Sequence, residues 1–287
     1  MYHIIANPKA GKVRRVLKHT LKMLEAAGAQ YTLHETQCKG DGKRIAEELT
    51  KEDGVVELIA IGGDGSVHDV LNGIRDVTKC RLGIIPLGTG NDFATSAQVS
   101  SKVKEAVGVI LRGECKPTDF LEVGGVRCMN VAGLGIDVDV LVRCNKGKTH
   151  GKLKYLRSLI VSLFKFKGYD VTVECEGETF AMKTLIGAAC NGMDFGGGIT
   201  ICPVAEIGDG KMDVMFVECF ESKWQIVKAF ITLMRKKIMD YPHKRYYRTD
   251  RVKIIPKEPC VVQLDGELYE NLEFDVKICE GLQMYRP

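Results

Sequence analysis

V-V-E-L-I-A-I-G-G-D-G-S-V-H, residues 55–68, is the stretch that decides the expected fold. Its first half, Val55–Ile61, is a mostly apolar run, which is typical of a strand buried in a parallel sheet. Helical spacing begins at Val67 and continues to Ile74. A glycine loop, Gly62-Gly63-Asp64-Gly65-Ser66, joins the two. The order strand, glycine loop, helix predicts an α/β fold.

The same order recurs directly afterwards. Arg81–Ile85 predicts a second strand, Pro86-Leu87-Gly88-Thr89-Gly90-Asn91-Asp92 is a second glycine loop, and a helix is expected from Phe93. Glycines let the backbone approach a ligand closely, and a helix N-terminus offers free N–H groups to an anion. Either loop alone would be an ordinary tight turn, and neither contains a Walker A motif. Two in tandem, each with an aspartate, indicate a site for phosphates and a divalent cation.

Both loops resemble the motifs of one group of kinases. G-G-D-G-S resembles a signature shared by NAD kinases, phosphofructokinases and the diacylglycerol kinase catalytic domain. P-L-G-T-G-N-D-F-A, residues 86–94, resembles the diacylglycerol kinase and sphingosine kinase branch specifically. The chain is similar along essentially its whole length to the soluble bacterial diacylglycerol kinases. The resemblance implies a lipid kinase that uses ATP and Mg²⁺.

Composition is that of an ordinary globular protein. The chain has 287 residues, of which 45% are hydrophobic and 27% charged, and a net charge of +4. That charge is too small to indicate a nucleic acid partner. No basic segment precedes the apolar start at Tyr2–Ala6, so no signal peptide is expected, and no apolar run is long enough to span a bilayer. We therefore expect a cytoplasmic protein whose 11 cysteines are reduced and bind no zinc.

Alternating strands and helices continue through the first domain. Tyr2–Ala6 and Tyr31–Glu35 predict strands, and helices are expected from about Lys12 to Ala27 and over Gly42–Glu52. Such alternation predicts a parallel sheet with crossover helices. We assign residues 1–121 to this nucleotide-binding α/β domain. The family resemblance adds the C-terminal segment 280–287.

After residue 121 the pattern changes to short segments that alternate apolar and polar residues, as Tyr169–Cys175 does. This alternation predicts a mainly antiparallel, β-sandwich-like second domain over residues 122–279, for the lipid substrate. Helices at Lys152–Lys167 and Ser222–Asp240 interrupt it. The active site is expected in the cleft between the domains.

Nucleotide-binding residues follow from the resemblance. Asn7-Pro8-Lys9-Ala10-Gly11 resembles the N-P-x-A-G loop that lies against the nucleotide, and Thr36 matches a threonine near it. Taken alone, Thr36 would be an ordinary turn or capping residue. The other expected contacts come from the two glycine loops: Gly62, Gly63, Asp64, Gly65, Ser66, Val67, His68, Gly88, Thr89 and Asn91.

A catalytic cation is expected between two aspartates. Asp64 and Asp92 each follow a strand, so both can reach one ion, and Mg²⁺ prefers such oxygen ligands. The resemblance adds Asp119 as the third member of a water-mediated magnesium network. Without the resemblance, Asp119 would be a turn or cap residue.

Leu264-Asp265-Gly266-Glu267 is the candidate for the catalytic base. Its alternative reading is structural, because Asp-Gly between two strands is a strong hairpin signal. The family carries L-D-G-E at this place, and the resemblance assigns its acidic residues to deprotonation of the lipid hydroxyl. Asp265, Glu267 and Asp64 are the expected catalytic residues. The sequence leaves open which of Asp265 and Glu267 is the base.

A structural magnesium site is implied by a second resemblance. N-G-M-D-F-G-G-G, residues 191–198, and the following P-V-A-E-I-G-D-G-K-M-D, residues 203–213, resemble a family stretch that holds such an ion. By position the ligands are Glu206, Asp209 and Lys211, the lysine through its carbonyl group. A glycine-rich turn without metal is the alternative. Gly208 replaces a family aspartate here, and His68 replaces an amide in the first glycine loop.

The helices of the second domain carry the expected partner surface. Ser222–Asp240 places Trp224, Ile231 and Met234 on one face, which we expect to pack on the sheet. Basic and aromatic residues over Arg235–Arg248 suit an anionic membrane surface. We expect peripheral membrane association and a lipid substrate. The sequence allows a homodimer and leaves the oligomeric state open.

Several functions remain open at this point. An ATP-dependent lipid kinase with diacylglycerol as acceptor leads, and a sphingoid base or another lipid alcohol is the nearest alternative. An NAD kinase-like enzyme would share G-G-D-G but not P-L-G-T-G-N-D-F-A. A catalytically silent nucleotide-binding regulator would not need Asp64, Asp92 and the L-D-G-E turn.

Overall fold

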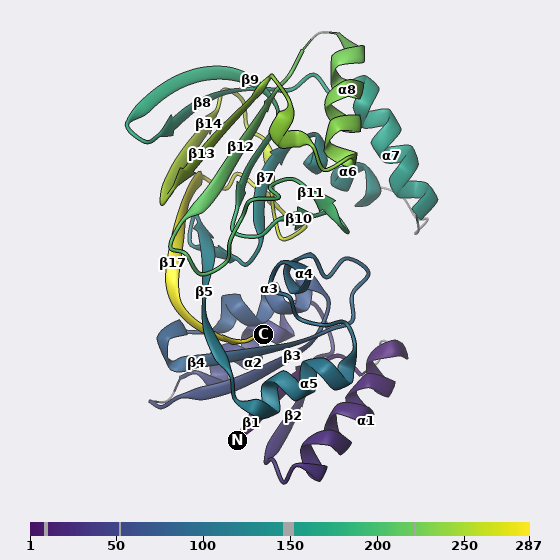
Figure 1. Ribbon diagram of the computed structural model, residues 1–287, viewed down its shortest axis with the longest axis vertical. Coiled ribbons are helices and arrows are strands. Elements are labelled where there is room, and N and C mark those ends of the chain that lie inside the picture. Colours follow the sequence, from purple (N-terminus) through teal and green to yellow (C-terminus); the bar gives the residue numbers. More distant parts are fainter. Residues whose placement is uncertain (9–10, 52, 146–151, 221) are drawn as a thin grey trace. The chain divides into compact units, whose positions relative to one another are not determined.

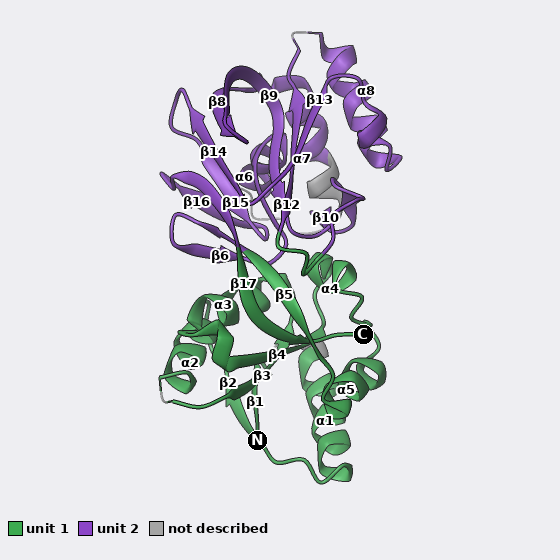
Figure 2. Ribbon diagram, turned by 60° about the vertical axis from the view of Figure 1, so that its left-hand side comes forward, with its two compact units in different colours: residues 1–120, 207–210, 279–287 green, residues 121–206, 211–278 purple. Residues whose placement is uncertain are grey.

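The computed structural model describes the whole chain except residues 9–10, 52, 146–151 and 221. The chain divides into two compact units (Figure 2). Unit 1 comprises Met1–Phe120, Ile207–Gly210 and Cys279–Pro287, and unit 2 comprises Leu121–Glu206 and Lys211–Ile278. The strands of both units pair into one continuous sheet, to which each unit contributes its own group of strands.

Unit 1 is built on a parallel sheet in the order β2-β1-β3-β4-β17. Its strands are β1 (Tyr2–Ala6), β2 (Tyr31–Glu35), β3 (Val56–Gly62), β4 (Cys80–Pro86) and the end of β17 (Phe274–Tyr285). Leu58 of β3 aligns with Leu82 of β4, and Ile4 aligns with Ile59. These side chains are fully buried, as expected for strands covered on both faces.

Helices cover this sheet. They are α1 (Gly11–Ala26), α2 (Asp41–Leu49), α3 (Asp64–Gly73), α4 (Asp92–Ser96) and α5 (Val103–Arg112), with a 3₁₀ turn at Val77–Lys79. α1 packs beside α5, and α2 packs beside α3 (Figure 1). On α1 the buried Val13 and Leu17 alternate with exposed Arg14 and Lys18 at helical spacing, so the helix forms as an amphipathic element.

Unit 2 is mainly antiparallel, and the predicted fold class is confirmed. Two pairs of strands, β15-β16 and β8-β9, are hairpins, and the long β9 pairs with β7, β8 and β12. β5 (Cys115–Val123) begins in unit 1 and ends in unit 2. The other strands of unit 2 are β6 (Val126–Cys128), β7 (Val131–Gly135), β8 (Tyr169–Cys175), β9 (Glu178–Cys190), β10 (Asp194–Phe195), β11 (Ile199–Thr200), β12 (Met212–Glu218), β13 (Lys244–Thr249), β14 (Arg251–Pro256), β15 (Val261–Leu264), β16 (Glu267–Glu270) and the start of β17.

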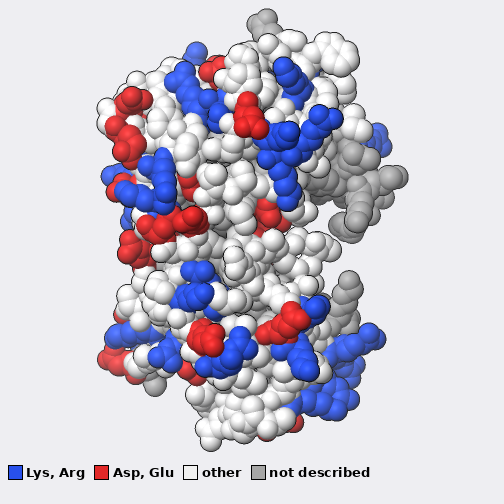
Figure 3. Space-filling model, viewed as in Figure 1, with Lys and Arg blue, Asp and Glu red and all other residues white. Residues whose placement is uncertain are grey.

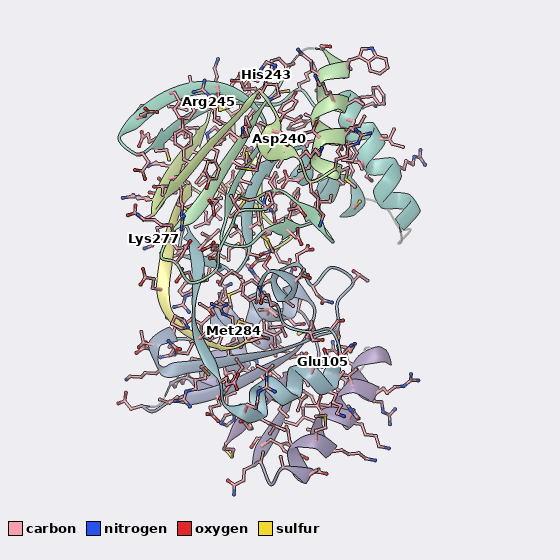
Figure 4. All side chains as sticks on the ribbon, viewed as in Figure 1. Glu105, Asp240, His243, Arg245, Lys277 and Met284 are labelled. Carbon is pink, nitrogen blue, oxygen red and sulfur yellow. The ribbon has the colours of Figure 1, made fainter. Side chains whose placement is uncertain are left out.

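β17 belongs to both groups of strands. Lys277 lies in the part that pairs with β14, and Met284 lies in the part that pairs in parallel with β4 (Figure 4). The alternation of apolar and polar residues in Phe274–Cys279 explains the antiparallel part, which has one face on the core.

Unit 2 has two cores. Phe216, Phe274 and Val252 belong to the first, between strands. The second lies under the helices α6 (Ile136–Asn145), α7 (Lys152–Lys165) and α8 (Lys223–Met234) and a 3₁₀ turn at Ile238–Asp240. Among the residues that the structure describes, no helix is long and apolar enough to cross a membrane.

The expected packing of the last helix is wrong in part. α8 ends at Met234, because Lys236 has a left-handed backbone with φ 58°. Its buried residues are Ile226, Ala229 and Leu233, whereas Trp224 is 83% exposed. Ile231 and Met234 are also exposed. The helix is apolar on nearly all sides, so the sequence pattern did not indicate which side packs on the sheet.

Candidate active site

The nucleotide-binding residues expected from the sequence gather at one edge of the unit 1 sheet. β1, β2, β3 and β4 are parallel, so the loops that follow them leave from the same edge. Asn7 and Pro8 follow β1, and Thr36 follows β2, where its N–H donates to the Ala6 carbonyl at 2.8 Å. Ligands bind open α/β sheets at this edge. Lys9 and Ala10 lie outside the described residues, and Gly11 begins α1.

The two glycine loops touch through their backbones. A Cβ on Gly63 would lie 3.0 Å from the Cα of Gly88, and a Cβ on Gly88 would lie 2.7 Å from the Cα of Gly63. The Leu87 N–H also donates to the Gly62 carbonyl at 2.8 Å. Only glycine allows this approach, which therefore joins the loops after β3 and β4 into one backbone surface.

Asp64 and Asn91 fasten the second loop. The Asn91 N–H donates to Oδ2 of Asp64 at 2.8 Å, across 27 positions of sequence. The Asn91 side chain accepts a bond from the Gly88 N–H at 2.7 Å and donates to the Gly88 carbonyl at 2.9 Å. Asn91 itself adopts a left-handed backbone with φ 55°, which asparagine tolerates better than most residues. The aspartate of the first loop thus positions the backbone of the second.

Both loops end in helix N-termini. α3 begins at Asp64, with Gly65, Ser66 and Val67 in its first turn, and α4 begins at Asp92. A Cβ on Gly62 would collide with Ser66 Oγ at 2.2 Å, so that hydroxyl lies directly against the strand end. His68 is buried in α3, and Thr89 lies in the second loop. The N–H groups of Ser66 and Val67 donate to the Gly63 carbonyl at 2.9 and 3.2 Å, and the N-terminus of such a helix favours an anion such as phosphate.

Asp119 lies in a different setting from Asp64. It is buried on β5, where its Oδ2 accepts a bond from the Gly210 N–H at 2.8 Å. Burial raises the pKa of Asp119, and the charges of Glu280 and Asp209 raise it further, while the Gly210 bond lowers it. The carboxylate is therefore tied to the Ile207–Gly210 segment.

The side chains near the glycine loops show whether a cation could be held there. Among the described residues no three His, Cys, Asp or Glu side chains gather closely enough to hold an ion directly. Asp64 is nevertheless bonded to the residue next to Asp92, which places two carboxylates on joined loops. Such a pair fits Mg²⁺ that keeps several of its waters. The water-mediated set of Asp64, Asp92 and Asp119 stays a prediction.

The expected structural magnesium ligands are divided between the units. Asp209 belongs to unit 1, whereas Glu206 and Lys211 belong to unit 2. The Lys211 ammonium lies 3.4 Å from Oδ2 of Asp250. Gly208 and Gly210 have φ of 92° and 72°, so this segment contains tight glycine bends. The ligand role of these three residues stays a prediction.

In unit 2 the L-D-G-E stretch is a two-residue hairpin. Leu264 pairs with Glu267, and Asp265 and Gly266 between them have φ of 54° and 86°, as a type I′ turn requires. The Asp265 carboxylate accepts from the N–H groups of Met129, Asn130 and Val131 at 2.7, 2.8 and 3.4 Å. The turn is thereby bound to the loop before β7.

A thiol also donates to Asp265. Cys128 Sγ donates to Oδ1 of Asp265 at 3.2 Å. Burial and then the Asp265 charge raise the pKa of this thiol well above its usual range. Glu267, by contrast, is half-buried at the start of β16. The two carboxylates of the turn therefore lie in different settings.

Two polar residues support this region: Asn130, which no sequence motif indicated, and Asn191, the first residue of the N-G-M-D-F-G-G-G stretch. Asn130 is buried, and its side chain donates to the Asp194 carbonyl. Asn191 donates to the Met129 carbonyl at 2.7 Å, and its backbone N–H donates to the Asn130 carbonyl at 2.8 Å. These bonds join the loop that holds Asp265 to the start of the glycine-rich stretch 191–198. No short motif contains Asn130, so only the fold identifies it.

Known families match both units. Residues 1–123 match the diacylglycerol kinase catalytic domain, and residues 130–282 match the YegS C-terminal NAD kinase beta sandwich-like domain. The chain is 29% identical over 270 residues to the diacylglycerol kinase of Bacillus subtilis, covering 92% of this chain and 88% of the relative. It is 30% identical over 290 residues to a "probable lipid kinase YegS-like" of Xanthomonas oryzae pv. oryzae, covering 94% and 91%.

Solved structures share the fold. A diacylglycerol kinase structure from Bacillus anthracis has a TM-score of 0.76 at 21% identity, with 100% of this chain and 96% of that chain covered. An NAD kinase from Archaeoglobus fulgidus in complex with ATP has a TM-score of 0.54 at 14% identity, covering 100% and 94%. At these identities the likeness shows the architecture alone.

Proposed function

Because the chain belongs to the family of diacylglycerol kinases and YegS-like lipid kinases, we propose that it transfers the γ-phosphate of ATP to the hydroxyl of diacylglycerol, giving phosphatidic acid. Family membership makes the protein a lipid kinase, a phosphotransferase with an alcohol group as acceptor and ATP as phosphate donor. Diacylglycerol as the acceptor is our proposal. It is supported by the curated relative from Bacillus subtilis, which carries that name.

The observation that carries the proposal is the joined pair of glycine loops. Phosphoryl transfer asks the protein mainly to position the phosphates and neutralise their charge. The backbone contact of Gly63 with Gly88, fastened by Asp64 and Asn91, brings the backbones of both loops together at one sheet edge. An ordinary pair of turns would not need this approach.

We assign nucleotide binding to residues 1–121 with 280–287 and acceptor binding to residues 122–279. The nucleotide contacts are those of the loops after β1 to β4, including Asn7, Thr36, Ser66 and Thr89. Asp64 and Asp92, with Asp119 through water, would hold Mg²⁺, which neutralises phosphate charge when bound. Glu206, Asp209 and Lys211 remain the proposed structural site.

The surroundings of the hairpin favour Glu267 as the base. Asp265 accepts three N–H bonds and a thiol bond, so its oxygens are already occupied. A general base must be able to take a proton from the acceptor hydroxyl within hydrogen-bond reach. We therefore propose Asp265 as a positioning residue that holds the turn, and Glu267 as the carboxylate that receives the proton.

Peripheral membrane association is also part of the proposal. On α8, Trp224, Ile231 and Met234 are exposed, and the exposed Arg235, Lys236 and Lys237 follow directly. Lys and Arg side chains gather near α8 in Figure 3. Arg245 of β13 is less available, because it lies 3.8 Å from Glu218 and stacks 4.5 Å over the Phe180 ring (Figure 4). A homodimer stays a prediction.

A phosphorylation assay with labelled ATP and a panel of acceptors tests the function. Dioleoylglycerol, ceramide, sphingosine, monoacylglycerol and NAD would be offered at equal concentration in mixed micelles. We expect the highest kcat/KM with dioleoylglycerol. Preference for sphingosine would assign a sphingoid-base kinase. Transfer to NAD alone, or to none of the acceptors despite bound ATP, would overturn the lipid kinase assignment for this chain.

A further inference from the structure

The residue that follows β17 binds three oxygens of unit 1. Arg286 donates through Nε to the Thr118 hydroxyl at 3.1 Å. Its Nη2 donates to the Pro117 carbonyl at 2.8 Å and to the Ile207 carbonyl at 3.1 Å. A guanidinium holds its donors in a rigid planar fork, so this one side chain fastens the Ile207–Gly210 segment to β5.

The Thr118 hydroxyl needs its bond from Arg286. Thr118 is fully buried, and its hydroxyl donates to the Lys116 carbonyl at 3.2 Å. The same oxygen accepts the Nε–H of Arg286. The hydroxyl is therefore paired both as donor and as acceptor, as buried polar groups in folded proteins are.

A glycine lets the segment come close to β5. Gly208 has φ 92°, and a Cβ at this position would lie 2.7 Å from the Pro117 carbonyl oxygen. The same Cβ would lie 3.1 Å from Nη2 of Arg286. Only glycine allows this backbone approach, and the approach brings the Ile207 carbonyl within reach of the guanidinium.

Asp119 is the residue that the fastened segment holds. Its carboxylate is buried, and Oδ2 accepts from the Gly210 N–H at 2.8 Å. Burial lowers the pKa of the Arg286 guanidinium, and the charge of Asp119 opposes this. The charges of Glu280 and Asp209 act on Asp119 as well. The guanidinium thus places a positive charge near several carboxylates and reduces their repulsion.

We propose that Arg286 is a positioning residue, which fastens the Ile207–Gly210 segment to β5 and thereby fixes the orientation of the Asp119 carboxylate. Because these bonds come from a side chain of the protein itself, the carboxylate is oriented before a cation binds. The inference rests on the proposed function and deepens it, since Asp119 acts on phosphoryl transfer through the proposed Mg²⁺ site.

Hydrogen exchange in the protein without metal or nucleotide tests the fastening. Arg286→Ala removes all three bonds, so we expect the backbone N–H groups over residues 207–211 to exchange about tenfold faster or more than in the parent. The matched control is Arg75→Ala, which removes a half-exposed arginine of unit 1 that lies 3.0 Å from Glu47. Equal exchange in Arg286→Ala and the parent, or faster exchange throughout unit 1, would overturn the proposal.

The Mg²⁺ dependence of turnover tests the role in the reaction. We expect Arg286→Ala to lower kcat about tenfold or more and to raise the free Mg²⁺ concentration for half-maximal turnover about fivefold, with KM for dioleoylglycerol within about twofold. Arg286→Lys keeps the charge but loses the fork, so its effects should be intermediate. A contact with a structural role alone would lower the thermal midpoint and leave the Mg²⁺ dependence unchanged, and that result would overturn the assignment.

Chemical rescue separates the guanidinium from other effects of the substitution. Millimolar methylguanidine should restore part of the turnover of Arg286→Ala and slow its exchange over residues 207–211. Gly208→Ala keeps Arg286 but sets a methyl group against the Pro117 carbonyl, so it should show the same losses without rescue. Rescue of both variants, or of neither, would overturn the proposal. Arg286→Lys and Gly208→Ala carry the same measurements if Arg286→Ala does not fold.

The two readouts separate this inference from the proposed function. If the parent phosphorylates none of the panel while Arg286→Ala exchanges faster over residues 207–211, the proposed function fails and the fastening of the segment by Arg286 stands. If the parent phosphorylates dioleoylglycerol and Arg286→Ala matches it in both exchange and Mg²⁺ dependence, the inference about Arg286 fails alone.

Discussion

Asp265 directs its carboxylate toward the backbone of its own unit. The N–H groups of Met129, Asn130 and Val131 and the Cys128 thiol surround it. From sequence, the D-G dipeptide already predicted the hairpin, and the structure confirms it. The division of roles with Glu267 could not be predicted, because the partners of Asp265 lie about 135 positions away in the chain.

Two isosteric variants should separate the roles in this turn. Asp265→Asn replaces a carboxylate that accepts several N–H bonds by an amide whose NH₂ group repels some of these N–H groups. We therefore expect a lower thermal midpoint and a large loss of turnover. Glu267→Gln should lower turnover about 100-fold or more with little change in thermal midpoint, because a lost general base costs about that much. ATP affinity should change little in both. Turnover, ATP titration and calorimetry on both variants check this; full turnover in Glu267→Gln would assign the base elsewhere.

Asp64 combines a structural bond with a catalytic charge. Asp64→Asn keeps an acceptor oxygen for the Asn91 N–H and removes one charge from the cation site. We expect a stable protein that loses about 100-fold or more of kcat, as for other removed electrostatic contacts. The matched control is Asp53→Asn, whose parent side chain is 98% exposed. Near-normal turnover of Asp64→Asn would contradict the magnesium assignment.

Asp137 should make stability depend on pH. Burial raises the pKa of Asp137 to about 6, while hydrogen bonds from backbone N–H groups and from the Gln263 side chain lower it. The folded protein then holds this proton more tightly than the unfolded chain, so the carboxyl destabilises the fold progressively as pH rises from about 4 to about 6. Tyr169 of β8 and Asp139 are the other titratable groups near it.

Asp137→Asn mimics the protonated carboxyl and removes this dependence. We expect the variant to match the parent near pH 4 and to exceed its free energy of unfolding by about 1 to 3 kcal/mol near pH 7.5. Urea unfolding of both proteins at the two pH values measures the difference. A constant difference across this range would show that the carboxyl is not desolvated in the folded protein.

At the scale of elements, the sequence pattern predicted the strands of unit 1 but not the helix α6 of unit 2. The strands of unit 1 were predictable, because continuous apolar runs such as Val56–Gly62 mark buried parallel strands. α6 was missed because Ile136-Asp137-Val138-Asp139-Val140 alternates like a strand, and only its packing on β7, β9 and α7 makes it helical. Asp137 is on this helix, so the burial of its carboxylate could not be predicted either.

The contact between the glycine loops is open to a direct test. Gly63→Ala and Gly88→Ala each place a methyl group against backbone, at 3.0 and 2.7 Å, so the loops must separate. We expect both variants to raise KM for ATP about tenfold or more, because a displacement of the loops misaligns the phosphate-binding N–H groups.

Gly108→Ala on α5 is the matched control for these loops. Its new methyl group would meet only the Arg112 side chain, at 3.5 Å, and alanine favours a helix by about 0.5 to 1 kcal/mol over glycine. We expect unchanged ATP kinetics and an equal or higher thermal midpoint. Loss of ATP affinity in the control, or its retention in the loop variants, would contradict the role of the contact.

At the scale of the whole molecule, the sequence indicated two architectures in one chain, and the fold class is confirmed. The local pattern could not indicate which contacts attach the C-terminal strand and the Ile207–Gly210 segment to unit 1, and only the family resemblance suggested the return of residues 280–287. Arg286 shows the reason. Its guanidinium donates to the carbonyls of Pro117 and Ile207 at 2.8 and 3.1 Å, contacts that no local pattern encodes.

The exposed apolar and basic residues of α8 should bring the protein to anionic membranes. Each Lys or Arg near such a surface contributes about 1 kcal/mol, so replacing Arg235, Lys236 and Lys237 by Gln should weaken binding to phosphatidylglycerol vesicles about tenfold or more. Added salt should weaken the parent similarly, since it screens exposed charges. Trp224→Ala should lower the part of the membrane affinity that salt does not affect, because burial of the indole ring in the membrane is an apolar interaction.

The matched control replaces the exposed Lys43, Lys102 and Lys104 of unit 1 by Gln, with the same change of charge. Vesicle cosedimentation at low and moderate salt measures all four proteins, and equal losses in the control would show that net charge, rather than α8, directs the protein to the membrane.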